Sequence, residues 1–83
     1  MIKSALTYRA ECEQIRKNLY TIRFNMDLFK MLRNIEKMVS ELGKLEADCR
    51  HQTKQYKLED PSNRIAKSID HLEKLILMAK LMD

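Results

Sequence analysis

The sequence contains very few glycine, proline and aromatic residues. Its 83 residues include one Gly, one Pro, no Trp, three Tyr and two Phe. So few turn formers and aromatic side chains argue against a β-rich fold, which needs many turns and a bulkier core. Leu, Met, Lys, Glu and Ile, which suit helices, dominate instead. With 34% charged residues, the composition predicts one all-α domain, residues 1–83, built from amphipathic helices.

Long apolar runs are absent as well. No stretch approaches the ~18–20 apolar residues that span a bilayer, and the first residues do not resemble a signal peptide. We therefore expect a cytoplasmic protein with no membrane partner, in the host cytoplasm if the protein is viral. The two cysteines, Cys12 and Cys49, have no recognised metal-binding spacing. Both fall on apolar seams, so we interpret them as reduced core thiols.

Motifs that carry catalysis are also missing. The sequence has no glycine-rich phosphate loop, no nucleophile elbow and no His-Glu-x-x-His pair, and its carboxylates are scattered among Lys and Arg. Cys49 and His51 lie about 200° apart around a helix, so they cannot share a metal ion. These observations predict a protein that is not an enzyme and that has no metal site and no cofactor.

Apolar residues recur at alternating spacings of three and four in three segments. This heptad pattern predicts helices at about residues 4–24, 27–57 and 62–82. The first seam comprises Ala5, Tyr8, Cys12, Ile15, Leu19 and Ile22. The second comprises Leu28, Met31, Ile35, Met38, Leu42, Leu45, Cys49 and Tyr56, widened by Leu32 and Val39. The third comprises Ile65, Ile69, Leu72, Ile76 and Ala79. Because Pro61 ends one helix and starts the next, we expect the last two helices to form an antiparallel hairpin.

Two positions allow more than one interpretation. The seam changes register near Asn25 and Asp27, residue types that favour helix N-caps. We expect a break there, although a stutter within one continuous helix would also explain the shift. Gly43 lies inside the second helix, where glycine costs about 1 kcal/mol relative to alanine. It is either a tolerated surface position or a point where another backbone approaches closely.

The last turns of the third segment are apolar on every side. A helix that is apolar all round is buried all round, and three helices of one chain have difficulty covering it. We therefore expect assembly into an oligomeric helical bundle. The predicted interface residues are Leu72, Leu75, Ile76, Leu77, Met78, Leu81 and Met82.

Cations stand at heptad intervals along the first two helices, and the net charge of the chain is +4. This basic ladder comprises Arg9, Arg16, Arg23, Lys30, Lys37 and Lys44. One interpretation is a solvated flank, and the other is an electropositive strip or the basic wall of an anion pocket between subunits. Tyr8 lies close enough to stack on a base, but seam packing also explains it. A helix start favours phosphate, which adds a second set: Ser62, Asn63, Arg64 and Lys67. Capping of the helix and solvation also explain these four residues.

The C-terminal third resembles a known hairpin. Leu58-x-x-Pro61-Ser62, then Leu72-Glu73, then Leu77-Met78-Ala79 are similar to the phage sponge proteins that counter CBASS and Thoeris immunity. The match covers about 25 of the 83 residues, and Asn63 stands where that family usually has Arg. The resemblance implies a viral, non-enzymatic helical oligomer that sequesters cyclic nucleotide signals in pockets between subunits.

The leading hypothesis is therefore a self-associating helical binding module, most specifically a nucleotide sponge. The candidate ligand-binding residues are Tyr8, Arg9, Arg16, Arg23, Lys30, Ser62, Asn63, Arg64 and Lys67. The first alternative is an adaptor or inhibitor that docks its apolar helix faces on another helical protein. The second is a nucleic-acid-binding protein of weak specificity, whose affinity would fall steeply with salt.

Overall fold

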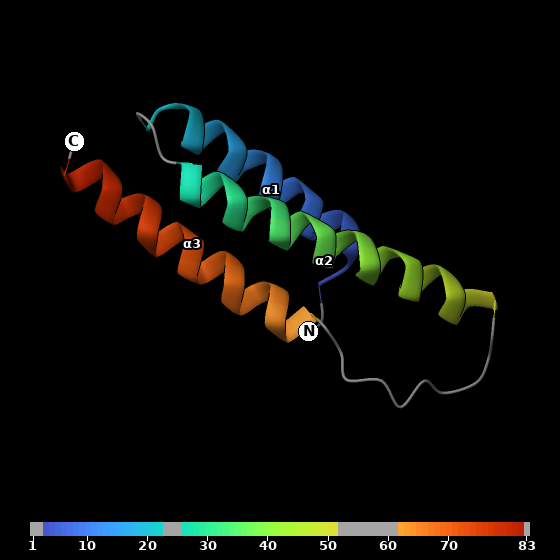
Figure 1. Ribbon diagram of the computed structural model, residues 1–83. Coiled ribbons are helices and arrows are strands. Elements are labelled where there is room, and N and C mark those ends of the chain that lie inside the picture. The colour runs from blue at the N-terminus through green and yellow to red at the C-terminus, as the bar shows by residue number, and fades with distance from the viewer. Residues whose placement is uncertain (1–2, 23–25, 52–61, 83) are drawn as a thin grey trace.

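The computed structural model describes residues 3–22, 26–51 and 62–82, and side chains within these ranges except at residues 48–51. It contains the helices α1 (Ala5–Tyr20), α2 (Met26–His51) and α3 (Ser62–Met82), packed lengthwise (Figure 1). The molecule is elongated, with principal extents of 50 × 19 × 16 Å. All regular structure within the described ranges is helical, which confirms the predicted all-α class with three helices.

Local signals define both ends of α1. The Oγ of Ser4 accepts a hydrogen bond from the Thr7 amide, so Ser4 is the N-cap. At the other end, the amide and hydroxyl of Thr21 both donate to the carbonyl of Asn18. The predicted end of this helix near Phe24 is therefore wrong, because these bonds close the last turn at Tyr20. A separate α2 begins at Met26, which confirms the break between the first two helices.

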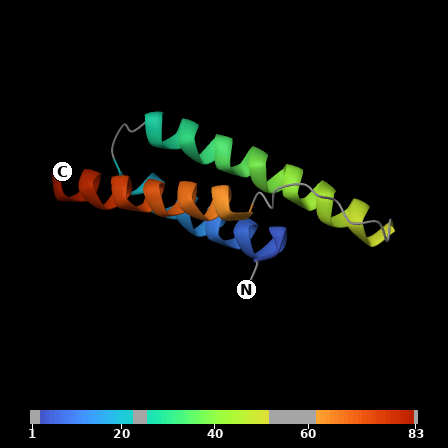
Figure 2. The ribbon, with the colours of Figure 1, turned by 90° about the horizontal axis from the view of Figure 1, so that it is seen from below.

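Contacts between side chains define the direction of the helices. The ring of Tyr20 packs on Phe29, with centroids 5.7 Å apart, while the Ala5 amide donates to Glu46 over 3.1 Å. The end of α1 therefore meets the start of α2, and the two helices run in opposite directions. The Tyr8 hydroxyl reaches the Ser62 carbonyl, so α1 and α3 start side by side. Figure 2 shows α2 extending beyond the other helices at its C-terminal end.

One apolar core joins the three helices, and its residues follow the predicted seams of α1 and α3. Every residue of the first predicted seam is buried, as are the first four of the third. In α2 the centre of the buried stripe differs from the expected seam, because Leu32 and Val39 are only 1% exposed whereas Met31 and Met38 are half-buried. This shift follows from the two neighbours of α2, since its stripe must face α1 and α3 together.

Part of the predicted second helix, and the connection to the third, lie outside the residues that the structure describes. Tyr56 and the connection over residues 52–61 fall outside the described residues, and so does the side chain of Cys49. Arg23, in the basic ladder, falls outside as well. The start of α3 at Ser62 matches the expected boundary of residues 62–82.

Candidate functional site

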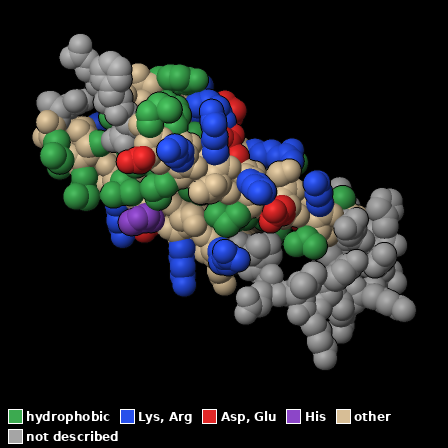
Figure 3. Space-filling view, viewed as in Figure 1, with side chains coloured by type: hydrophobic (Ala, Val, Ile, Leu, Met, Phe, Trp, Pro, Cys, Tyr) green, Lys and Arg blue, Asp and Glu red, His purple; other side chains and the backbone are tan. Residues whose placement is uncertain are grey.

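Large apolar side chains are exposed together at one end of the molecule. The end of α1, the start of α2 and the end of α3 all lie there (Figure 1), and Figure 3 shows apolar side chains gathered over the end of α3. Six of these side chains are 58–86% exposed. We call this surface the apolar end; it comprises Tyr20, Met26, Leu77, Met78, Leu81 and Met82. Among the large apolar residues that are similarly exposed in the described ranges, Leu6 alone lies elsewhere, near the start of α1.

The predicted interface residues divide between this surface and the core. Leu77, Met78, Leu81 and Met82 belong to the apolar end, whereas Leu72 and Ile76 are buried within the chain itself and Leu75 is half-buried. Leu72 and Ile76 belong to the apolar core that the three helices share, so they present little surface to a second copy. The predicted interface did not include Tyr20 and Met26. Their position on either side of the break was the available signal, since a break brings both to the same end.

A shallow pocket of about 330 Å³ opens between α1 and α3 beside the apolar end. Asn18 lines it from α1, and Ile76 and Leu77 line it from α3. Two charged residues of α3, Glu73 and Lys80, stand at its rim. The pocket therefore continues the apolar surface of α3 toward α1.

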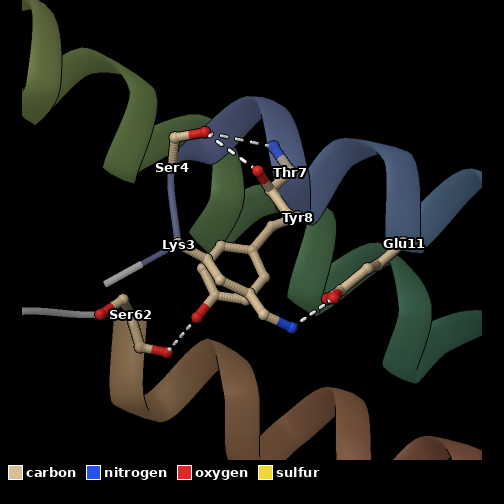
Figure 4. A network of polar contacts seen from close by, with 6 residues as sticks. All are labelled: Lys3, Ser4, Thr7, Tyr8, Glu11 and Ser62. Carbon is tan, nitrogen blue, oxygen red and sulfur yellow. Dashed lines mark hydrogen bonds and ion pairs between the residues drawn. The ribbon is translucent and has the colours of Figure 1, made fainter. Parts of the chain in front are cut away.

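Tyr8 and Ser62 do not face solvent. The ring of Tyr8 is 3% exposed and its hydroxyl donates to the Ser62 carbonyl over 3.0 Å (Figure 4). Lys3 lies over this ring and forms an ion pair with Glu11, which raises the pKa of Lys3. The expectation that Tyr8 stacks on a base is wrong in this arrangement, because the ring is packed between α1 and α3. The seam-packing interpretation of Tyr8 is confirmed, and Ser62 is itself only 3% exposed.

The break also divides the basic ladder. Heptad spacing aligns cations on one side only along a continuous helix, whereas Arg9 and Arg16 lie on α1 and Lys30 lies on the antiparallel α2. Arg16 forms an ion pair with Glu36 across the two helices, and this carboxylate raises the pKa of Arg16. Arg16 is therefore already engaged. Lys30 is exposed on α2, beside the apolar end.

Three further residues of the predicted ligand set, two of them cations, lie on α3. Asn63, Arg64 and Lys67 are exposed in its first two turns. Arg9, by contrast, lines the groove between α1 and α2. The structure therefore does not bring these residues together in one pocket within a single chain.

The groove between α1 and α2 contains two adjoining pockets that share Arg9. The smaller, about 230 Å³, is lined by Arg9, Cys12, Glu13, Glu36 and Val39. Cys12 is 3% exposed, and burial raises the pKa of its thiol to about 11. Because the thiolate is the reactive form, this cysteine is a poor nucleophile at neutral pH. The buried position of Cys12 confirms its interpretation as a core residue.

The described residues contain neither a metal cluster nor a membrane-spanning helix. Within the described residues, no group of three or more His, Cys, Asp or Glu side chains could hold a metal ion. No helix in the same part of the chain has both the length and the apolar character needed to cross a membrane. Comparisons of the chain with protein family models, with curated proteins and with solved structures found no match.

Proposed function

We propose that the chain is a non-enzymatic, self-associating helical binding module whose copies join through the apolar end. In this proposal α2 and α3 form the antiparallel hairpin of each copy, and the copies assemble into an oligomeric helical bundle. The observation that supports it most directly is the grouping of six exposed large apolar side chains where the three helices meet solvent. Large exposed apolar surfaces are typical of interaction sites.

The size of the apolar end favours a second copy as its occupant. Fully burying a Leu or Met side chain is worth about 1.5–3 kcal/mol, so six that are 58–86% exposed would gain roughly 1–2 kcal/mol each. A two-fold axis would bury the same surface on both copies, for a total of roughly 12–24 kcal/mol. Association itself costs about 4–15 kcal/mol. The two ranges overlap only between about 12 and 15 kcal/mol, so the gain exceeds the cost over most of them when both partners contribute an end.

The test is the mass of the purified protein in solution over a range of concentrations. Light scattering coupled to size exclusion is expected to show a multiple of the 9.9 kDa chain mass at micromolar concentrations. The double variant Leu77→Glu, Leu81→Glu should be monomeric, because it places four charges in a two-fold interface. Both side chains are exposed, so the core of each copy is preserved.

Leu6→Glu is the matched control for this experiment. Leu6 is as exposed as the apolar-end leucines but lies near the start of α1, away from that end. This variant should assemble as the original chain does. A chain that is monomeric at every concentration, or an assembly that Leu6→Glu disrupts as much as the double variant does, would contradict the proposal.

The adaptor hypothesis uses the same surface with a different partner. Three of the six residues of the apolar end are Met, whose flexible side chains adapt to surfaces of different shape. A partner helix could therefore replace the second copy. Self-association remains the proposal, because it needs no component besides the chain itself.

Sequestration of cyclic nucleotides is the narrower activity implied by the resemblance to the phage sponge proteins. With Tyr8 and Ser62 buried and Arg16 paired, such a site would rest on exposed side chains of different helices or different copies. Its members would be drawn from Arg9, Lys30, Asn63, Arg64 and Lys67. Calorimetric titration with cyclic di- and trinucleotides tests this activity. If none of these nucleotides gives a heat of binding, the proposed sequestration is wrong.

A further inference from the structure

The second pocket of the α1–α2 groove lies away from the apolar end, where α1 starts and α2 nears its last turns. It is a shallow, open pocket with a volume of about 420 Å³. Arg9 and Leu6 contribute from α1, and Ser40, Gly43 and Lys44 contribute from α2. The pocket therefore combines two cations, a hydroxyl and an apolar side chain.

The charges in this pocket are not balanced. Within the described residues, neither Arg9 nor Lys44 has a carboxylate within ion-pair distance, whereas Arg16 is paired with Glu36. The carboxylate that lines the pocket, that of Glu46, already accepts hydrogen bonds from the Ala5 amide at 3.1 and 3.3 Å. Two cationic groups are thus available to a ligand, while the Glu46 carboxylate is engaged at the start of α1.

Gly43 explains how the guanidinium of Arg9 reaches the surface of α2. A Cβ atom at this position would lie 3.3 Å from Nη2 of Arg9, closer than an ordinary van der Waals contact. The missing side chain therefore leaves room for the guanidinium beside the α2 backbone. Lys44 follows directly in the sequence and lines the same pocket, so the glycine helps to bring a cation from each helix to one place.

We propose that this pocket binds a small phosphate-bearing molecule between Arg9 and Lys44. A guanidinium donates two parallel hydrogen bonds to phosphate oxygens, and an ammonium adds a point charge. The Ser40 hydroxyl is a further donor, and Leu6 offers an apolar surface to the body of the ligand. The ligand is therefore a phosphate ester with a small apolar or aromatic group rather than a bare inorganic ion. This site is independent of the association of copies through the apolar end.

The single glycine of the chain provides the reporter for a direct test. In a ¹⁵N-labelled sample, the Gly43 amide is the only glycine signal, and it is followed during titration with phenyl phosphate. We expect a saturable shift, and weaker binding of inorganic phosphate, which cannot contact Leu6. Arg9→Gln and Lys44→Gln should each weaken phenyl phosphate binding at least about fivefold, since each removes a charge-assisted hydrogen bond.

Lys17→Gln is the control, because it removes the same charge from an exposed position of α1 that does not line the pocket. The affinity of the Lys17→Gln variant for phenyl phosphate should stay within twofold of that of the unsubstituted protein. No saturable shift of Gly43, or equal weakening by Lys17→Gln and Arg9→Gln, would overturn the proposal. All three residues are exposed, so circular dichroism should show the same helix content in every variant.

Discussion

Replacing Gly43 by Ala should stabilise the protein, and the structure allows the size of the effect to be worked out. The added Cβ would meet two atoms, Nη2 of Arg9 at 3.3 Å and Cβ of Ala5 at 3.6 Å. The second is an ordinary contact. The first is tight, but it involves the far end of an exposed, flexible side chain that can shift by a few tenths of an ångström. Both neighbours are side-chain atoms, so the contacts at Gly43 do not support the close approach of another backbone.

The expected gain comes from the helix itself. Alanine is favoured over glycine by about 1 kcal/mol in the interior of a helix, and Gly43 lies well inside α2. Displacing the Arg9 guanidinium costs a small part of this gain, because that group has no ion pair to lose within the described residues. The free energy of unfolding should therefore rise by about 0.5–1 kcal/mol. In a domain of this size, the melting temperature should rise by roughly 2–8 °C.

Thermal unfolding followed by circular dichroism is the assay, at one protein concentration because self-association also raises the apparent stability. Arg9→Ala and the double variant Arg9→Ala, Gly43→Ala complete a cycle that separates the contact with Arg9 from the helix effect. If Gly43→Ala lowers the melting temperature, and does so equally when Arg9 is absent, then α1 and α2 lie closer at Ala5 than the 3.6 Å contact indicates. That result would refute the reasoning.

Two further predictions concern buried groups of α1. Tyr8→Phe removes the hydrogen bond to the Ser62 carbonyl and should lower the free energy of unfolding by about 0.5–1.5 kcal/mol, measured by urea denaturation; no change would mean that water replaces the bond at no cost. Burial raises the pKa of Cys12 from 9.0 to about 11. The contribution of the neutral thiol to the free energy of unfolding is therefore fully present below pH 9. This stability should be lost as the pH rises toward 11, by about 1–2 kcal/mol, and Cys12→Ala should not show this loss.

The buried faces of α1 and α3 could be predicted from spacing alone, because an amphipathic helix buries whatever its apolar period aligns. Leu19 and Ile65, both 0% exposed, stand on the predicted seams. The centre of the α2 stripe could not be predicted in the same way. Two interleaved registers run along that helix, one through Met31 and one through Leu32, and the position of its neighbours decides which is buried more deeply.

The candidate sites were harder to predict, because they depend on which helices meet. The heptad ladder of cations indicated a single strip, but the break after Tyr20 reverses the chain direction and separates its members. The hydrogen bond from Tyr8 to Ser62 joins residues 54 positions apart, and nothing in the local pattern indicates it. The excess apolar surface at the end of α3, in contrast, could be predicted from the sequence, because Leu81 and its apolar neighbours point in every direction around the helix axis.

The two proposed sites should act independently, and this follows from their positions. The apolar end lies where α1 finishes, whereas the phosphate pocket includes Leu6 and Arg9 from the first turns of α1 and Lys44 from the antiparallel α2. Copies that join end to end leave this groove open to solvent. The affinity for phenyl phosphate should therefore be the same in the monomeric double variant Leu77→Glu, Leu81→Glu as in the assembled protein. An affinity that falls when the copies separate would instead place part of the pocket between subunits, and the assembly would then differ from an end-to-end arrangement.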